Sequence, residues 1–229
     1  ARDAERLAGV WREREAEAAD YFARNAARWD ELRSLHVDEA QVEAAILRAA
    51  GAGPFRRLVD LGTGSGRMLA LFADRCERAV GLDLNQQMLN LARAQAARLG
   101  LARCELRHGD IFATGLAAAS ADLVVVHRVL HYLIDPAAAV AEAARLVAPD
   151  GRLLIVDFAP HALEHLRDQH QHRRLGFSGE EMARWLRAAG LEPAPEVVLP
   201  PADAAGLTVA VWAATPVRDR AAAPARRAA

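Results

Sequence analysis

Short apolar runs alternate with helical segments along most of this chain, and no other feature of the sequence restricts the fold as strongly. The apolar runs typical of buried strands cover residues 58–61, 79–83, 104–108, 122–126, 152–158, 196–199 and 207–212. Helical patterns between them cover residues 67–75, 86–99, 136–147 and 180–189. Strands that alternate with helices of this length form parallel βαβ units, so the sequence predicts an α/β fold with a doubly wound, seven-stranded sheet. A proline-rich loop joins the last two strands, which favours an antiparallel last strand.

A glycine-rich turn follows the first of these strands. Gly62, Gly64 and Gly66 stand at alternate positions, where they let the backbone turn sharply and approach a ligand closely. Asp83 ends the second strand, where an acidic side chain accepts the ribose hydroxyls of an adenosine. A glycine turn with a solvated aspartate is the alternative. Arg67 stands where a dinucleotide fingerprint has its third glycine, which disfavours NAD and FAD.

Composition excludes several classes of protein. All 29 basic residues are arginine, so the Schiff-base lysine of pyridoxal-phosphate enzymes and the Walker lysine of P-loop proteins are both absent from this sequence. The net charge of -1 gives no basic field, so we expect no nucleic-acid binding by this piece. No apolar run approaches the ~20 residues of a membrane span, so we expect no membrane partner. Cys76 and Cys104 stand far apart, as is typical of reduced thiols, and we expect a cytoplasmic protein.

Five sequence motifs follow one another along the chain. Together and in this order they identify a protein family more specifically than any single motif does. They cover residues 59–66, 80–89, 108–112, 121–131 and 148–157. Together they resemble the class I S-adenosylmethionine-dependent methyltransferases, whose Rossmann-like sheet binds S-adenosylmethionine and releases S-adenosylhomocysteine. In that resemblance, Asp110 reaches the adenine amino group. The cofactor-binding residues it implies are Asp60, Gly62, Thr63, Gly64, Asp83, Leu84, Met88, Gly109, Asp110, Ile111 and His127.

The N-terminal residues are expected to form a helical arm. Residues 21–30 resemble the lid helix of the ubiquinone-methyltransferase-like branch, which closes over the cofactor. Tyr21 and Trp29 would then place aromatic faces near the sulfonium, and Arg33 would pair with the cofactor carboxylate. Core aromatics and a solvated arginine are the alternatives. We predict three parts: a helical lid over 1–40, a methyltransferase domain over 41–214 and a disordered tail over 215–229.

Two further stretches, residues 33–37 and 170–178, resemble methyltransferases fused behind an ArsR-type winged-helix repressor. That resemblance implies an upstream DNA-binding module, which this sequence does not include, and leaves a homodimer through the N-terminal helix open. Arsenite is rejected as the substrate, because enzymes of that kind look built on several thiolates and this chain has two cysteines.

The methyl acceptor is expected near the carboxyl end of the fourth strand, where open α/β sheets place ligands. His127, His131, Asp157 and His172 are the candidate catalytic residues, with His131 as the better candidate for a general base. A buried core histidine is the alternative for His127. The histidine-rich run 161–172 is expected to face the substrate, with a solvated helix as the alternative. No cysteine or acid completes a ligand set there, so we predict no metal.

Two functions fit these features. The first is methyl transfer to a small-molecule acceptor, in which the protein contributes alignment, exclusion of water and one base. The second is a regulatory sensor that binds S-adenosylmethionine or S-adenosylhomocysteine with little or no turnover and controls an attached DNA-binding module. The fold does not separate them, because function resides in the site. Methyl transfer is our leading hypothesis.

Overall fold

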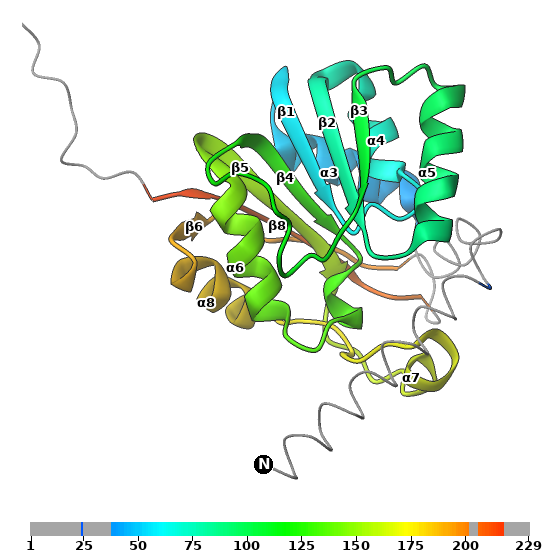
Figure 1. Ribbon diagram of the computed structural model, residues 1–229. Helices are drawn as coiled ribbons and strands as arrows, with labels where there is room; N and C mark the ends of the chain where they lie inside the picture. Colours follow the sequence, from blue (N-terminus) through cyan, green and yellow to red (C-terminus); the bar gives the residue numbers. More distant parts are fainter. Residues whose placement is uncertain (1–23, 25–37, 202–205, 218–229) are drawn as a thin grey trace, which may run out of the picture.

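One sheet of eight strands forms the centre of the computed structural model, which describes residue 24 and residues 38–201 and 206–217 (Figure 1). The strand order is β3-β2-β1-β4-β5-β8-β6, and β7 also pairs with β8. β1 to β5 are parallel, whereas β8 is antiparallel to β5. The predicted doubly wound sheet with an antiparallel last strand is therefore confirmed. The strands are β1 (Phe55–Leu61), β2 (Cys76–Asp83), β3 (Cys104–His108), β4 (Ala121–His127), β5 (Val147–Phe158), β6 (Leu191–Pro193), β7 (Val197–Leu199) and β8 (Val209–Pro216).

Helices cover both faces of the sheet (Figure 1). α6 and α8 pack against one face and α3 and α4 against the other, so the sheet is buried between two apolar cores. None of the described helices is long and apolar enough to cross a membrane. The helices are α3 (Glu39–Ala50), α4 (Arg67–Leu71), α5 (Gln86–Arg98), α6 (Pro136–Leu146), α7 (His165–His170) and α8 (Gly179–Ala188), with short 3₁₀ turns η2 (Ala73–Arg75) and η3 (Leu130–Tyr132).

Polar caps fix where the helices around the carboxyl edge of the sheet begin. The Asp38 carboxylate accepts the backbone N–H groups of Ala40 and Gln41 at the start of α3. The Asn85 side chain likewise accepts backbone N–H groups at the start of α5, directly after β2. Asp135 caps α6, whose first residue is Pro136. Such side chains satisfy donors that the helix itself leaves unpaired, so each helix starts at a defined residue.

Several element boundaries differ from the sequence-based prediction. The helix predicted over 67–75 ends at Leu71, because Phe72 turns into the core and packs edge-on against Phe55, with ring centroids 6.2 Å apart. The short α7 lies within the run 161–172, where a solvated helix was the alternative. The short strand β6 was missed, and it pairs with Thr215 and Pro216 at the end of β8. The disordered tail predicted from residue 215 is therefore wrong at those two positions.

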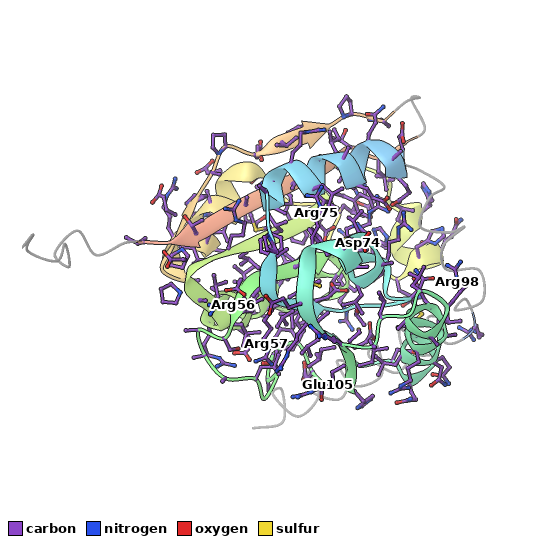
Figure 2. The ribbon with its side chains drawn as sticks, turned by 90° about the horizontal axis from the view of Figure 1, so that it is seen from above. Arg56, Arg57, Asp74, Arg75, Arg98 and Glu105 are labelled. Carbon is purple, nitrogen blue, oxygen red and sulfur yellow. The ribbon has the colours of Figure 1, made fainter. Side chains whose placement is uncertain are left out.

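The amino ends of β1, β3 and β4 carry charged side chains. Figure 2, which views the molecule from above, labels Arg56 and Arg57 of β1 and Glu105 of β3. Asp122 of β4 accepts the backbone N–H of Arg57 at 2.8 Å, and the Arg56 guanidinium lies 3.4 Å from the same carboxylate. These contacts join β1 to β4 at this end. The cavity described below lies at the opposite, carboxyl ends of the strands.

Candidate functional site

The turn after β1 is the most constrained backbone of the site. Gly62 and Gly64 have φ angles of 71° and 53°, a region that side-chain-bearing residues rarely adopt. The backbone N–H groups of Gly62 and Thr63 both donate to the Leu82 carbonyl oxygen, at 2.8 and 2.9 Å. A Cβ on Gly62 would clash with the side chain of Val129. The glycines are thus required by backbone conformation and by close packing between the ends of β1, β2 and β4.

Asp83 holds this turn in place through both of its carboxylate oxygens. Oδ2 accepts the backbone N–H of Gly64 and Oδ1 accepts that of Asn85, each at 2.8 Å. Burial raises the pKa of the Asp83 carboxyl, and the N–H groups of Asn85 and Gly64 oppose that shift. A carboxylate has about four acceptor positions, so Asp83 retains capacity for hydroxyl groups of a ligand.

Asp60 lies behind the turn and does not line the cavity. Its exposed fraction is 1%, and the Thr63 hydroxyl donates to its Oδ2 at 2.6 Å. Burial raises the pKa of Asp60 to about 7; the Thr63 hydroxyl lowers it and the Asp83 charge adds to the rise. Among the described residues, nothing hydrogen-bonds to its Oδ1. Asp60 and Thr63 therefore support the turn from the protein interior. The sequence had predicted that both contact the cofactor, but neither lines the cavity.

A cavity of about 260 Å³ lies at the carboxyl ends of the parallel strands. It spans the junction of β1 and β4, where the strand order reverses, and open α/β sheets bind ligands at such a point. The predicted cofactor-binding residues that line it are Gly62, Gly64, Asp83, Leu84, Met88, Gly109, Asp110 and Ile111. Residues that follow β4 and β5 line the other side: Arg128, Val129, Tyr132, Leu133, Ile134 and Arg173.

The four predicted catalytic residues are close to the cavity but are not part of its lining. His127 is buried at the end of β4. His131 Nδ1 lies 2.7 Å from Asp157 Oδ1, and both side chains are almost fully buried. The His131 ring packs against Tyr132 and His172, with centroids 3.9 and 4.3 Å away. The structure thus brings His131, Asp157 and His172 together, and the neighbouring Tyr132 lines the cavity.

The histidine-rich run 161–172 forms α7 and the segments beside it. The His172 ring stacks on Phe158 at the end of β5, with centroids 5.7 Å apart and an interplanar angle of 15°. Burial lowers the pKa of His161. Within residues 38–201 and 206–217, no group of three or more His, Cys, Asp or Glu side chains is placed to hold a metal ion. The run packs next to the cavity, and Arg173, the residue directly after the run, lines the cavity.

Two arginines of the lining were missed by sequence reasoning. Arg128 has a left-handed backbone (φ 55°) and is 7% exposed. Its Nη1 donates to Glu39 at 2.5 Å, and its guanidinium lies 5.7 Å from the Phe158 ring centroid. Glu39 is 89 positions away along the chain, so no local pattern could reveal this pair. Arg173 stands beside another arginine on a loop, where charge alone does not distinguish it from a solvated residue.

The predicted contacts of the N-terminal arm cannot be placed. Tyr21, Trp29 and Arg33 lie outside the described residues, so their contacts with the cofactor stay predictions.

Comparisons with known proteins agree with this geometry. A family model described as a methyltransferase domain matches residues 59–155. The ubiquinone biosynthesis O-methyltransferase of Ralstonia nicotianae is 30% identical over 195 residues, which cover 76% of this chain and 79% of the relative. The chain belongs to the class I S-adenosylmethionine-dependent methyltransferases. The recognition that the motifs suggested is confirmed at this level.

Other methyltransferases extend the comparison. The demethylmenaquinone methyltransferase of Deinococcus radiodurans is 33% identical over 148 residues, 62% of this chain and 61% of the relative. Among solved structures, the Burkholderia thailandensis 1,6-didemethyltoxoflavin-N1-methyltransferase superposes with a TM-score of 0.73 at 23% identity, covering 90% of each chain. That likeness shows the fold. The chain spans about half the length of several of the curated relatives it matches.

The cofactor of this methyltransferase family fits the residues present. Asp83 and Asp110 line one side of the cavity, where their carboxylates are of the chemistry that accepts ribose hydroxyls and an adenine amino group. Leu84 and Phe112 line the same side and are exposed, at 63% and 39%, as suits apolar contact with a planar base. The glycine turn leaves its backbone uncovered beside them. S-adenosylmethionine, predicted from the motifs, is therefore the cofactor of this domain.

Replacing Asp83 by Ala should weaken S-adenosylhomocysteine binding by roughly 10- to 100-fold, because hydrogen bonds to a charged acceptor contribute ~1.5–3 kcal/mol. The variant also loses two contacts that hold the turn, so we expect a small loss of thermal stability. Titration calorimetry measures the affinity. Asp122→Ala, at the opposite end of the sheet, is the control and should bind normally. An Asp83→Ala protein with wild-type affinity would overturn the assignment.

Replacing Asp60 by Asn should change the pH dependence of stability. A carboxyl whose folded-state pKa is raised from 3.8 to about 7 favours the protonated form, so its ionisation destabilises the fold increasingly between about pH 4 and pH 7. Asn stays neutral, so Asp60→Asn should raise the free energy of unfolding at pH 8 by up to about 4 kcal/mol and by much less at pH 5. Urea denaturation at both pH values checks this. The exposed Asp74→Asn is the control, and an effect independent of pH would contradict the prediction.

Proposed function

We propose that this domain transfers a methyl group from S-adenosylmethionine to a small-molecule acceptor. The observation that carries the proposal is the continuity of the cavity. One side has the acids and glycines that suit an adenosine, and the same cavity continues past the ends of β4 and β5. The methyl-bearing end of the cofactor would point toward this second half, where an acceptor would meet it. The relatives described above are named as methyltransferases, which favours turnover over sensing.

Bound S-adenosylmethionine supplies an already activated methyl carbon, so the protein does not have to generate a reactive group. The residues of this chain align the two molecules and exclude water. Asp83, Asp110 and the glycine turn hold the nucleoside part on the β1–β2–β3 side. Val129, Leu133 and Ile134 give the β4–β5 side apolar walls.

The proposal is tested by incubating the purified domain with methyl-labelled S-adenosylmethionine and a deproteinised extract of small molecules. A labelled product that requires the domain supports transfer. If S-adenosylhomocysteine binds tightly but no label leaves the cofactor, the sensor hypothesis replaces this one.

His131 and Asp157 are proposed as positioning residues. The general-base role suggested by sequence finds little support in their placement, because His131 is 1% exposed and absent from the cavity lining. The His131 ring instead backs Tyr132, and its carbonyl oxygen accepts the backbone N–H groups of Arg173 and Arg174 at 2.8 and 3.1 Å. Asp157 holds the ring through Nδ1. The pair thereby joins the segments that follow β4 and β5 and fixes the wall that faces the acceptor.

Replacing His131 by Ala should raise KM for the acceptor found in the transfer assay by roughly tenfold or more, and leave S-adenosylhomocysteine affinity nearly unchanged. Asn can place its amide N–H where Nδ1 donates to Asp157, so His131→Asn should restore much of the lost affinity. Steady-state kinetics over pH 6–9 distinguish the roles. Should His131→Ala and His131→Asn both lose kcat about 100-fold together with the low-pH limb of the profile, His131 is the base after all.

The N-terminal arm is proposed to act as the lid of this cavity. Two structural features support it: the exposed apolar side chains of Leu84 and Phe112 at the cavity edge, and the Glu39–Arg128 contact that ties the first turn of α3 to the lining. Hydrogen exchange over residues 21–33 should slow when S-adenosylhomocysteine binds. Identical exchange with and without the ligand, and normal ligand binding by a chain lacking residues 1–36, would refute the lid.

The remaining expectations from sequence stand as proposals. An upstream winged-helix module, a homodimer through the N-terminal helix and a cytoplasmic location rest on resemblance and composition. Light scattering of the purified protein tests the dimer, and a monomer at micromolar concentration would exclude it.

A further inference from the structure

One edge of the sheet is formed by a strand with a single neighbour. β3 stands first in the strand order and, among the residues that the structure describes, pairs only with β2. Figure 1 shows β3 at one side of the sheet, beside α5. A strand in this position presents a row of backbone N–H and C=O groups that can pair with a further strand. The side chains of β3 decide whether such a pairing forms, and with which strand.

The hydrogen bonds at the two ends of β3 show which of its backbone groups are directed away from β2. The Arg103 carbonyl oxygen accepts a backbone N–H of β2, and the Gly109 N–H donates to a carbonyl oxygen of β2. Residues that bond to one neighbour alternate with residues directed away from it. The N–H and C=O groups of Leu106 and His108 therefore point to the open edge. Outside the pairing of the strands, no backbone–backbone hydrogen bond in the described part of the chain involves either residue.

Side chains of opposite charge flank Leu106 on one face of β3. Glu105 and Arg107 are two positions apart and so point to the same face, where they form an ion pair and are 57% and 40% exposed. Leu106 points to the opposite face and packs on the core that includes Leu69 of α4. α5 covers that face too, because the crossovers β1–α4–β2 and β2–α5–β3 are right-handed and advance in the same direction. The face with Glu105 and Arg107 is therefore not covered by α4 or α5.

This pattern of charges is complementary to itself in one arrangement. When two β3 strands run antiparallel with Leu106 opposite Leu106 of a second copy, each Glu105 stands opposite the Arg107 of the other copy. The two Leu106 residues then exchange both backbone hydrogen bonds, because their N–H and C=O groups point to the open edge. Glu105 and Arg107 form the intervening pairs without backbone hydrogen bonds, in which side chains approach most closely. Both charge pairs therefore form in the same register as the backbone bonds.

Other registers place like charges opposite one another. A shift of the antiparallel register by two residues brings Glu105 opposite Glu105, or Arg107 opposite Arg107 when the shift is in the other direction. A parallel pairing in register places each of these residues beside its own copy. Opposite charges directly across from one another stabilise a pair of strands, and like charges destabilise it. The charges of β3 therefore select one register, whereas charges on an edge strand often serve only to prevent pairing.

We propose that β3 is the interface of a symmetric dimer, in which two copies of this chain join their eight-stranded sheets into one continuous sheet. The occupant of the open edge is a second copy, selected by the two Glu105–Arg107 pairs. Charge pairs on an exposed surface are weak and are screened by salt, so this dimer dissociates readily and more so at high salt. The interface differs from the N-terminal helix considered above, and the proposal does not depend on the proposed function.

The test reverses the two charges separately and together. Analytical ultracentrifugation of the full chain at low salt, over a series of concentrations up to the millimolar range, measures the association of the wild type, Glu105→Arg, Arg107→Glu and the variant with both changes. Arg78→Glu is the matched control, because Arg78 is exposed and lies on β2 rather than on the open edge. Circular dichroism confirms that each variant is folded.

The wild type and Arg78→Glu should form a dimer that dissociates as salt is added. Each single change at Glu105 or Arg107 should raise the dissociation constant of the dimer by roughly tenfold or more, because like charges then face each other in both pairs. The variant with both changes keeps opposite charges across the interface, so it should dimerise as the wild type does. For the same reason, an equimolar mixture of the two single variants should form a heterodimer.

Hydrogen exchange gives a second measurement at the interface itself. The backbone N–H groups of Leu106 and His108 should exchange more slowly in the wild type as its concentration rises, and not in Arg107→Glu.

A wild type that stays monomeric over the whole concentration series would overturn the proposal. Single variants that dimerise as the wild type does would also overturn it, because the two copies would then meet elsewhere, for example through the N-terminal helix. So would the absence of a dimer both in the variant with two changes and in the mixture of single variants, because opposite charges at these positions would then not select the partner.

Discussion

The carboxylate of Asp83 joins two parts of the backbone on which the rest of the site depends. It accepts the N–H of Gly64 in the turn after β1 and the N–H of Asn85 at the start of α5. Asn85 in turn caps α5, so one side chain fixes the glycine turn, the end of β2 and the first turn of the helix. The acid expected to bind the ribose is thus also part of the fold. Contacts within the protein fix its geometry, which lowers the cost of binding.

The division of the cavity follows from the strand order. β1 lies between β2 and β4, so the turn after it faces the nucleoside side and the acceptor side at once. The two sides are then built by different means. On the proposed nucleoside side, backbone contacts of the glycine turn and two acids form the wall. The proposed acceptor side is assembled from segments distant in sequence: η3, Asp157 at the end of β5, and the loop that carries His172 and Arg173.

Sequence reasoning succeeded where the determining interactions are local. Buried apolar runs located most of the strands, and Gly62, Gly64 and Asp83, singled out by their spacing, line the cavity. Sequence reasoning failed where contacts between residues distant along the chain determine the structure. The strand pairing of Thr215 depends on β6, a three-residue strand that ends in a proline. The burial of His131 depends on its contact with Asp157 and on the packing of residues after α7. Sequence periodicity does not reveal such long-range contacts.

Helix α3 contacts both sides of the cavity through two acidic residues. Glu39 and Glu43 are four positions apart and so lie on the same face of the helix. Glu43 binds Arg67, the first residue of α4 after the glycine turn, and Glu39 binds Arg128 after β4. Arg128 has a left-handed backbone, a conformation that costs on the order of 1–3 kcal/mol and persists only when its surroundings enforce it. Its N–H bond to Val156 and the contact with Glu39 supply that enforcement. A displacement of α3 would therefore disturb the glycine turn and the Arg128 segment together, so the position of this helix bears on cofactor and acceptor alike.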